Sequence, residues 1–239
     1  MTLTERILNA GLRAAFRIAC RIDTSELRRL PAHGPGFILT NHTSNVEGPA
    51  IYAFIQPRPA TALAKRELWN NPITRFVMET WRTIPIERGR VDKKALAAAF
   101  RALDHGQFLG VAPEGTRSRN GVLGEGHPGI AILAASRRVP IYPVGHTGFN
   151  EMMRNLMHLR RTRIKFRVGR PFEIVLPKPV QERRPTPSQL RAVTTEIMYQ
   201  LAALLPEDRR GRYRDLSAAT TEFLSFTDNS SAGRTPGAR

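Results

Sequence analysis

A histidine and a carboxylate stand five positions apart early in the chain, as His42 and Glu47. They follow the apolar run at 36–40, which the sequence predicts to be a strand. On a continuous helix, five positions would turn the two side chains about 140° apart. Pro49 argues against such a helix, because proline is tolerated in the first turn but not deep inside. We therefore expect a helix that begins near Glu47 or Gly48, with His42 in the loop before it.

Such a loop can bring the carboxylate of Glu47 back to the imidazole of His42. A carboxylate bonded to one ring nitrogen fixes the tautomer and makes the other nitrogen a better base. The arrangement corresponds to the histidine and the acid of a serine-protease triad, and the substrate hydroxyl takes the place of the serine. A competing interpretation of Glu47 is structural. Ser44 and Glu47 match a capping box, and a carboxylate is favoured at a helix N-terminus in any case.

A second candidate segment spans 112–118, with the sequence Ala-Pro-Glu-Gly-Thr-Arg-Ser, and follows the apolar run at 108–111. A strand end followed by proline and glycine predicts a turn whose backbone N–H groups can face an anion. Arg117 can hold a phosphate with both arms of its guanidinium. Arg88, beside a glycine at another strand end, can reach the same anion. For both arginines, a solvated surface charge is the alternative.

Composition limits the classes of function. The chain has 239 residues, 41% of them hydrophobic, which suits one α/β domain with small additions. A net charge of +17 points to an anionic partner: nucleic acid, an acidic membrane surface or a phosphorylated substrate. The lone cysteine, Cys20, allows no internal disulfide and fits a reducing compartment. The histidines lack the spacing of metal ligands, so we expect no metal and no cofactor.

The pattern of elements predicts a largely parallel or mixed sheet covered by helices. Residues 3–22 read as an amphipathic helix with one stripe of arginines, which either packs on the domain or lies in a membrane interface. We expect an N-terminal helical segment at 1–29, a catalytic domain at 30–216 and a disordered tail at 217–239. The predicted strands are 36–40, 61–64, 83–86, 108–112, 140–144 and 163–168, and the other predicted helices are 48–54, 73–80, 93–104, 129–136 and 188–205.

No apolar run approaches the roughly 20 residues that a membrane-spanning helix needs, and no convincing signal peptide is seen. We therefore expect a cytoplasmic protein, peripheral on the cytoplasmic face of a membrane. Basic clusters at 160–170 and 209–214, together with the N-terminal helix, are predicted to hold the protein on anionic lipid. Nucleic-acid binding is the competing interpretation, but only the charge favours it, and no recognised motif supports it.

Four segments, in this order and at these spacings, resemble the sequence blocks of the glycerolipid acyltransferase family. They are 41–47, 84–90, 112–118 and 139–144, and the resemblance runs from roughly residue 30 to residue 170. It includes the Lys-Arg-Glu-Leu run at 65–68 and the Asn-Pro pair at 71–72. The best-known members of this family are 1-acyl-sn-glycerol-3-phosphate acyltransferases. The resemblance implies the α/β fold of that family.

The resemblance also implies roles for particular residues. His42 would be the general base, and Glu47 stands where the family has its carboxylate. Arg88 and Arg117 would bind the acceptor phosphate, and that site would be shaped by the segment Glu114, Gly115 and Thr116. The chain departs from the family at Glu47, where aspartate is usual. The extra methylene must be accommodated by the loop, or catalysis is lost while binding is retained.

The implied reaction is acyl transfer to the free hydroxyl of a lysophospholipid. The acceptor would be 1-acyl-sn-glycerol-3-phosphate or another lysolipid, and the product from the first would be phosphatidic acid. Acyl-CoA or an acyl-carrier protein would serve as co-substrate. The alternative, motivated by Glu47, is a catalytically impaired protein that binds lipid or acyl-CoA.

Overall fold

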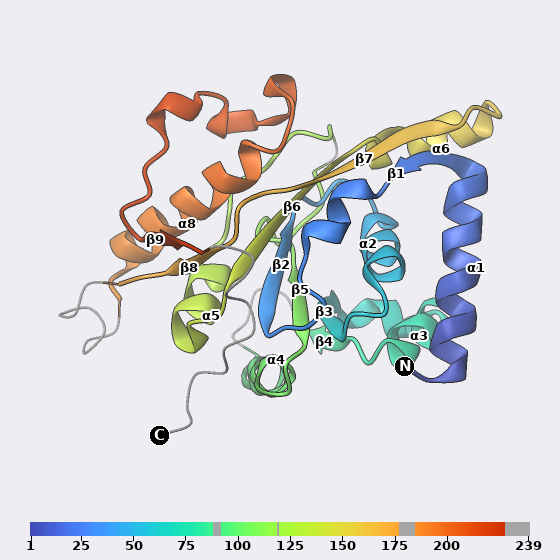
Figure 1. Ribbon diagram of the computed structural model, residues 1–239, viewed down its shortest axis with the longest axis horizontal. Helices are drawn as coiled ribbons and strands as arrows, with labels where there is room; N and C mark the ends of the chain where they lie inside the picture. Colours follow the sequence, from blue (N-terminus) through green and yellow to red (C-terminus); the bar gives the residue numbers. More distant parts are fainter. Residues whose placement is uncertain (88–91, 119, 177–184, 228–239) are drawn as a thin grey trace.

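The computed structural model describes residues 1–87, 92–118, 120–176 and 185–227, and every structural statement below refers to these (Figure 1). Its strands form one sheet in the order β1-β7-β6-β2-β5-β3-β4, with β8 and β9 added beside β6. The strands are β1 (Cys20–Asp23), β2 (Gly36–Thr40), β3 (Ala60–Lys65), β4 (Ile84–Ile86), β5 (Phe108–Val111), β6 (Ile141–Thr147), β7 (Thr162–Val168), β8 (Phe172–Ile174) and β9 (Leu224–Phe226).

The centre of the sheet is parallel and its margin is mixed. Strands β6, β2, β5, β3 and β4 run in the same direction, so their carboxyl ends meet at one edge. Strand β7 runs antiparallel to β6, and β1 pairs with β7 in parallel. Strand β8 is antiparallel to both β6 and β9. This confirms the predicted mixed, largely parallel sheet.

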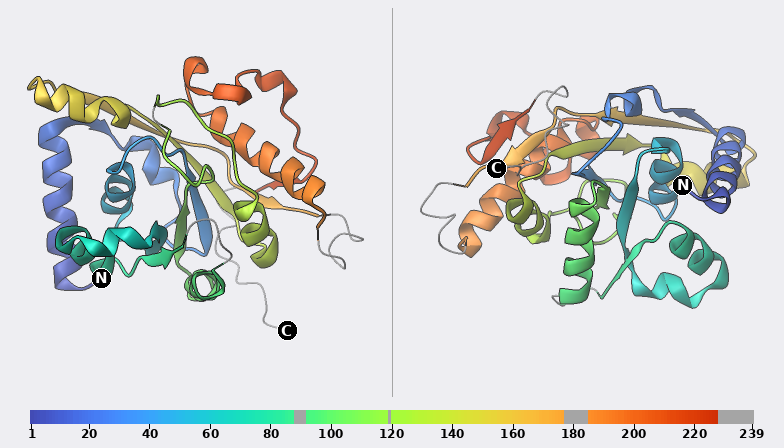
Figure 2. Two further views of the ribbon diagram at one scale, coloured as in Figure 1. Left: turned by 180° about the vertical axis from the view of Figure 1, so that it is seen from behind. Right: turned by 60° about the horizontal axis from the view of Figure 1, so that its bottom comes forward.

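Helices cover both faces of the sheet. They are α1 (Leu3–Ala19), α2 (Glu47–Ile55), α3 (Pro72–Thr80), α4 (Lys93–Asp104), α5 (Gly129–Arg137), α6 (Phe149–Met157) and α8 (Pro187–Ala202). One apolar core joins α4, α5 and α8 to one face, and a second joins α1, α2 and α6 to the other. Figure 1 shows α1, α2 and α6 together on one side of β2, with α5 and α8 on the other. Figure 2 shows the same layers from two further directions.

Local sequence signals explain where several helices begin. Thr2 caps α1 and Thr186 caps α8, each in a capping box, with a glutamate or glutamine three positions on. Asn71 caps α3, and Pro72 occupies its first helical position, where a missing N–H costs nothing. Asp92 caps α4 by accepting from two backbone N–H groups.

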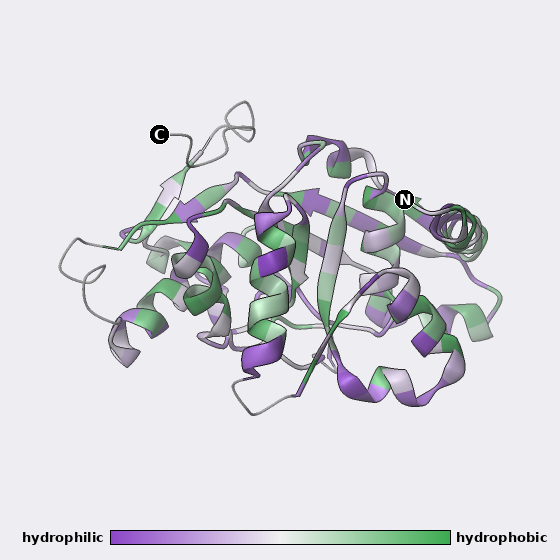
Figure 3. Cartoon of the chain, turned by 90° about the horizontal axis from the view of Figure 1, so that it is seen from below, coloured by the Kyte–Doolittle hydropathy of each residue, from purple (hydrophilic) through white to green (hydrophobic). Residues whose placement is uncertain are grey.

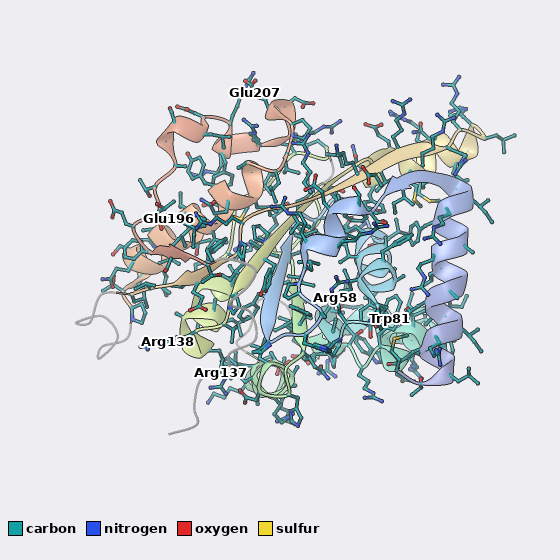
Figure 4. The ribbon with its side chains drawn as sticks, in the orientation of Figure 1. Arg58, Trp81, Arg137, Arg138, Glu196 and Glu207 are labelled. Atoms are coloured by element: carbon teal, nitrogen blue, oxygen red, sulfur yellow. The ribbon has the colours of Figure 1, made fainter. Side chains whose placement is uncertain are left out.

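The N-terminal helix ends earlier than predicted, at Ala19 rather than at residue 22. Residues 20–23 leave the helix and join the edge of the sheet as β1. The helix is fixed to the domain in its first half, where the Trp81 indole N–H donates to the Asn9 side chain over 3.0 Å. Trp81, labelled in Figure 4, also stacks on Tyr52 with ring centroids 4.3 Å apart. The segment therefore packs on the domain rather than standing apart from it.

The prediction of a disordered tail from residue 217 is wrong for residues 217–227. Residues 224–226 form β9, and Leu224 is buried. The buried carboxylate of Glu196, labelled on α8 in Figure 4, fixes the segment. It accepts bonds from the Thr220 hydroxyl and from the N–H groups of Glu222 and Phe223. The polar composition of the segment hid this anchoring, which depends on an acid far away in sequence. The rest of the tail, 228–239, lies outside the described residues.

Within the described ranges, no helix combines the length and the apolar character needed to cross a bilayer.

Candidate active site

The two motifs meet at the edge of the sheet where the parallel strands end. Strands β2 and β5 are neighbours, paired from Gly36 with Phe108 to Leu39 with Val111. The loop after β2 therefore lies beside the turn after β5. The Ser118 N–H donates to the His42 carbonyl over 2.8 Å. In open α/β sheets, ligand sites commonly lie outside the carboxyl ends of the strands.

His42 and Glu47 form the pair that their spacing predicts. The imidazole Nδ1 is hydrogen-bonded to Glu47 Oε1, and the Thr43 N–H donates to the same oxygen over 3.2 Å. The Glu47 side chain is 2% exposed, whereas that of His42 is 23% exposed. The acid is thus held beneath the imidazole, and the imidazole reaches the surface. With Nδ1 committed to Glu47, the other ring nitrogen, Nε2, is the one available to a substrate.

The start of α2 tests the capping-box interpretation of Glu47. The helix begins at Glu47, as Pro49 predicted, and its cap residue is Val46 rather than Ser44. The Ser44 hydroxyl accepts from the Val46 N–H, and the Glu47 carboxylate faces His42. The capping-box interpretation is therefore wrong for this helix, because Ser44 is not its cap residue.

Glu114 lies in a different environment from the one expected for a residue that shapes a phosphate site. It is buried, and its carboxylate accepts from the His42 N–H over 2.9 Å and from the Gly124 N–H over 3.2 Å. Burial raises the pKa of the Glu114 carboxyl, and these two hydrogen bonds act against that rise. The acid thus fastens the His42 backbone to the turn after β5, which makes it a positioning residue for the imidazole.

The tip of the second motif is open to solvent. Gly115, Thr116 and Arg117 are exposed at the tip of the turn. Gly115 has a φ of +63°, and a Cβ there would lie 2.9 Å from His127 Cδ2, so the turn favours glycine. Arg117 has no ion pair or side-chain hydrogen bond among the described residues, which leaves its guanidinium available to an anion. Arg88, the other predicted phosphate ligand, lies outside the described residues.

A buried histidine behind the pair was not predicted. The backbone N–H and C=O of His146 bond the Asn41 side-chain amide over 2.9 and 3.1 Å. His146 Nε2 lies 2.6 Å from the Asn41 carbonyl oxygen. Burial lowers the pKa of the His146 imidazole, so the ring is neutral and donates from Nε2. These bonds fix the residue that precedes His42. The sequence signal was an asparagine beside the motif histidine and a second histidine shortly after a buried strand.

The part of the chain that the structure describes shows no set of metal ligands. No group of three or more histidine, cysteine or acidic side chains there is placed to hold a metal ion.

Comparison with known families decides the identity of this arrangement. The family model described as Acyltransferase matches residues 21–147, which is more than half of the chain and includes both motifs. The chain belongs to the acyltransferase family. The resemblance seen in the sequence is thereby confirmed, and His42, Glu47 and the turn at 112–118 all lie inside the matched region.

Two curated members of the family match over part of their length. N-acylphosphatidylethanolamine synthase of Arabidopsis thaliana is 30% identical over 171 residues, which are 63% of this chain and 60% of that protein. A 1-acyl-sn-glycerol-3-phosphate acyltransferase of Pseudomonas aeruginosa is 27% identical over 129 residues, 53% of this chain and 49% of that one. The match thus spans between about half and 60% of the length of these relatives.

A solved structure shares the fold. The 1-acyl-sn-glycerophosphate (LPA) acyltransferase PlsC from Thermotoga maritima superposes with a TM-score of 0.62 at 20% identity. The similarity covers 87% of this chain and 80% of that one. The mixed sheet with helices on both faces is therefore the fold of that acyltransferase.

Proposed function

We propose that the protein transfers a fatty acyl group from acyl-CoA or acyl-carrier protein to the free hydroxyl of a lysophospholipid. The acceptor we favour is 1-acyl-sn-glycerol-3-phosphate, which gives phosphatidic acid. The observation that carries the proposal is the His42–Glu47 pair, in which a buried carboxylate holds Nδ1 of a partly exposed imidazole. The related acyltransferases from Pseudomonas aeruginosa and Thermotoga maritima support the choice of acceptor.

In the proposed mechanism, His42 Nε2 takes the proton from the acceptor hydroxyl as its oxygen attacks the thioester carbonyl. The tetrahedral intermediate collapses, the ester forms, and the C–S bond breaks. The leaving thiolate takes the proton back from the imidazolium, so no proton is left on the enzyme. Glu47 stabilises the imidazolium between these steps, because its negative charge lies against Nδ1.

Arg117 is the proposed ligand of the acceptor phosphate. Its guanidinium is exposed and unpaired within the described ranges, and Ser118 next to it is bonded to the His42 backbone. The acceptor can therefore place its phosphate on the turn while its hydroxyl approaches the imidazole. Arg88 is proposed as a second phosphate ligand, from a position outside the described residues. Thr116 and Gly115 complete the exposed tip of this turn.

The test is release of free CoA from acyl-CoA, measured across a panel of acceptors. The proposal expects fast release with 1-acyl-sn-glycerol-3-phosphate, slower release with lysolipids that carry larger headgroups, and background release without an acceptor. Release that is indifferent to the acceptor would contradict it. Acyl-carrier protein charged with the same acyl chain, tested in parallel, identifies the donor.

A second acceptor is favoured by the name of the plant relative. N-acylphosphatidylethanolamine synthase suggests acyl transfer to the amine of phosphatidylethanolamine, and the same imidazole could take a proton from that amine. Phosphatidylethanolamine therefore belongs in the panel, and an amide product that resists mild alkali identifies this activity. The binding-only alternative predicts that acyl-CoA binds and no acceptor is acylated.

We also propose that the protein acts peripherally on an anionic membrane surface, on its cytoplasmic face. The substrates proposed above are lipids, and the net charge of +17 favours an acidic surface. Co-sedimentation with vesicles tests this, with phosphatidylglycerol-containing and pure phosphatidylcholine vesicles compared. Indifference to the anionic lipid would contradict it.

A further inference from the structure

Four apolar side chains protrude from α6 and from the turn that ends it. Met153, Leu156, Met157 and Leu159 are 58%, 42%, 75% and 94% exposed. We call these four residues the α6 tip. The opposite side of α6 is fixed, since Phe149 and Met152 are buried in the core beneath. Such a cluster on an otherwise packed helix calls for a partner.

The backbone holds the α6 tip outward. Three N–H groups close the turn after α6: those of His158 and Arg160 donate to the Asn155 carbonyl over 3.0 and 2.9 Å, and that of Leu159 donates to the Leu156 carbonyl over 3.0 Å. Leu159 has a φ of +54°, a left-handed conformation that glycine or asparagine adopts at lower cost. A leucine is therefore kept almost fully exposed at a position where local conformation favours a different residue.

Helix α1 carries a second exposed apolar strip on its outer side. Leu3, Ile7 and Ile18 are 72%, 65% and 76% exposed. At 100° per residue they fall within about 60° of one another around the helix. Phe16 faces the other way and is buried against α6, where its ring lies 6.3 Å from that of Phe149. Figure 3, which looks nearly along α1, shows hydrophobic and hydrophilic residues around its circumference.

The end of α1 and the α6 tip belong to the same end of the molecule, as Figures 1 and 2 both show. The Arg161 guanidinium, which follows the tip in sequence, donates to the Cys20 carbonyl over 2.7 Å and to the Arg17 carbonyl. A shallow hollow of about 390 Å³ opens at this junction, and Arg17, Arg21 and Arg161 line it together with Asp23. Cations therefore outnumber acids beside the apolar residues.

The arginines around the α6 tip indicate which kind of partner fits it. Arg154 and Arg160 flank the α6 tip and are exposed, and no ion pair involves them in the described part of the chain. The C-terminal cluster differs, because Arg209, Arg212 and Arg214 are each paired with a nearby acid. A second copy of the chain would bring the same cations against these, which disfavours self-association. Exposed apolar residues rimmed by cations instead match an anionic lipid surface.

We propose that the α6 tip inserts into the interface of an anionic membrane, with the outer strip of α1 beside it. The hollow at Arg17, Arg21 and Arg161 then receives a lipid phosphate. This inference rests on the peripheral membrane location proposed above and adds the element that makes contact. It places α6, which directly follows β6 of the catalytic sheet, on the lipid.

The direct test is a fluorescent probe at the tip. Cys20 is buried and burial raises the pKa of its thiol, so a Leu159→Cys variant can be labelled selectively with an environment-sensitive dye. On phosphatidylglycerol-containing vesicles the dye emission should shift to the blue and be quenched by lipids brominated in their acyl chains. The matched control is Ile132→Cys on α5, 46% exposed and in the opposite layer, which should show no shift.

A second measurement gives the size of the effect. Replacement of both Met157 and Leu159 by serine should weaken binding to anionic vesicles about tenfold or more, because apolar area no longer enters the interface. The control, Ile132→Ser with Val175→Ser, also removes two exposed apolar side chains and should bind like the parent. Unchanged circular dichroism would show that the variants are folded.

Two other outcomes count against the proposal. A protein that co-sediments while the dye at residue 159 stays in water docks through another surface. A protein that ignores vesicles but dissociates from dimer to monomer on the serine substitutions uses the tip for a second copy. Acyl transfer to a short-chain, water-soluble lysolipid separates this proposal from the catalytic one. The serine variants should retain that activity. If the unmutated protein shows no such activity, only the catalytic proposal is overturned.

Discussion

The loop after β2 and the helix after β6 follow neighbouring parallel strands, and they are built in opposite ways. Two buried acids are bonded to this loop: Glu47 accepts from His42 and Thr43, and Glu114 accepts from His42 and Gly124. On the outer side of α6, apolar side chains are exposed, and Arg154 and Arg160 beside them have no ion pair among the described residues. Preorganised polar groups suit chemistry at one place, and unpartnered side chains suit docking to a surface.

Among the residues that support His42, the largest effect should come from removing the charge of Glu47 while keeping its shape. Glu47→Gln leaves an amide against His42 Nδ1, which can favour the wrong tautomer and cannot stabilise an imidazolium. We expect kcat to fall on the order of 1,000-fold. Glu67→Gln, at an exposed position, is the matched control. Steady-state acyl transfer measures both, and a Glu47→Gln variant with parental kcat would mean that this pair is only structural.

Glu114→Ala should have the next largest effect, although its side chain acts through the His42 backbone. Its loss leaves the His42 and Gly124 N–H groups without their acceptor, at a cost of about 1–3 kcal/mol each if they stay buried. A slightly displaced imidazole should lower kcat about 100-fold with little change in KM. Glu125→Ala, an exposed acid nearby, is the control. A rise in KM without a fall in kcat would indicate that Glu114 shapes the phosphate site, as the family resemblance implies.

Arg117→Ala should affect binding of the acceptor rather than the chemical step. Loss of one charge-assisted contact corresponds to about a 20-fold rise in KM for the phosphorylated acceptor. For an acceptor without the phosphate, the variant and the parent should have the same KM. Arg191→Ala on the exposed side of α8 is the control. An equal rise in KM for acceptors with and without the phosphate would show that Arg117 does not bind the phosphate.

His146→Phe should have the smallest effect on activity, about fivefold, because the two backbone bonds to the Asn41 amide remain. Its effect on pH dependence is more informative. Burial lowers the pKa of His146, so the folded state binds a proton less readily than the unfolded state. Its contribution to stability is present above the unfolded pKa of about 6.5 and is lost as the pH falls through the folded value.

Urea unfolding between pH 7 and pH 5 measures this contribution. The parent should lose stability towards pH 5, and the His146→Phe variant should lose less over the same range. Identical slopes for the two proteins would show that His146 does not titrate in this way.

The sequence predicted the fold and the contact between His42 and Glu47 because their signals are local. The apolar run before His42 and the proline at residue 49 placed the loop and the start of α2 correctly. The contacts that a distant residue makes could not be predicted. Examples are the Glu114 carboxylate on the His42 N–H, the Asn41–His146 bonds, and the anchoring of residues 217–227 by Glu196. Each joins segments that become neighbours only when the sheet forms.

The surface features were predicted only in part. The alternation of residues on the N-terminal helix indicated an arginine stripe, but it did not separate the buried apolar side of α1 from the exposed one. Helix α6 was missed altogether, because its nine residues are fewer than the roughly 11–18 over which helical periodicity is recognised.

The most direct test of the account is the rate of acyl transfer by His42→Ala against His33→Ala, in a single turnover with saturating acyl-CoA and lysophosphatidic acid. His33 is exposed and makes an appropriate control. We predict that the His42→Ala rate falls by about 1,000-fold while acyl-CoA binding is unchanged, and that the His33→Ala rate equals that of the parent. A His42→Ala variant that transfers the acyl group at the parental rate would contradict the assignment of His42 as the base.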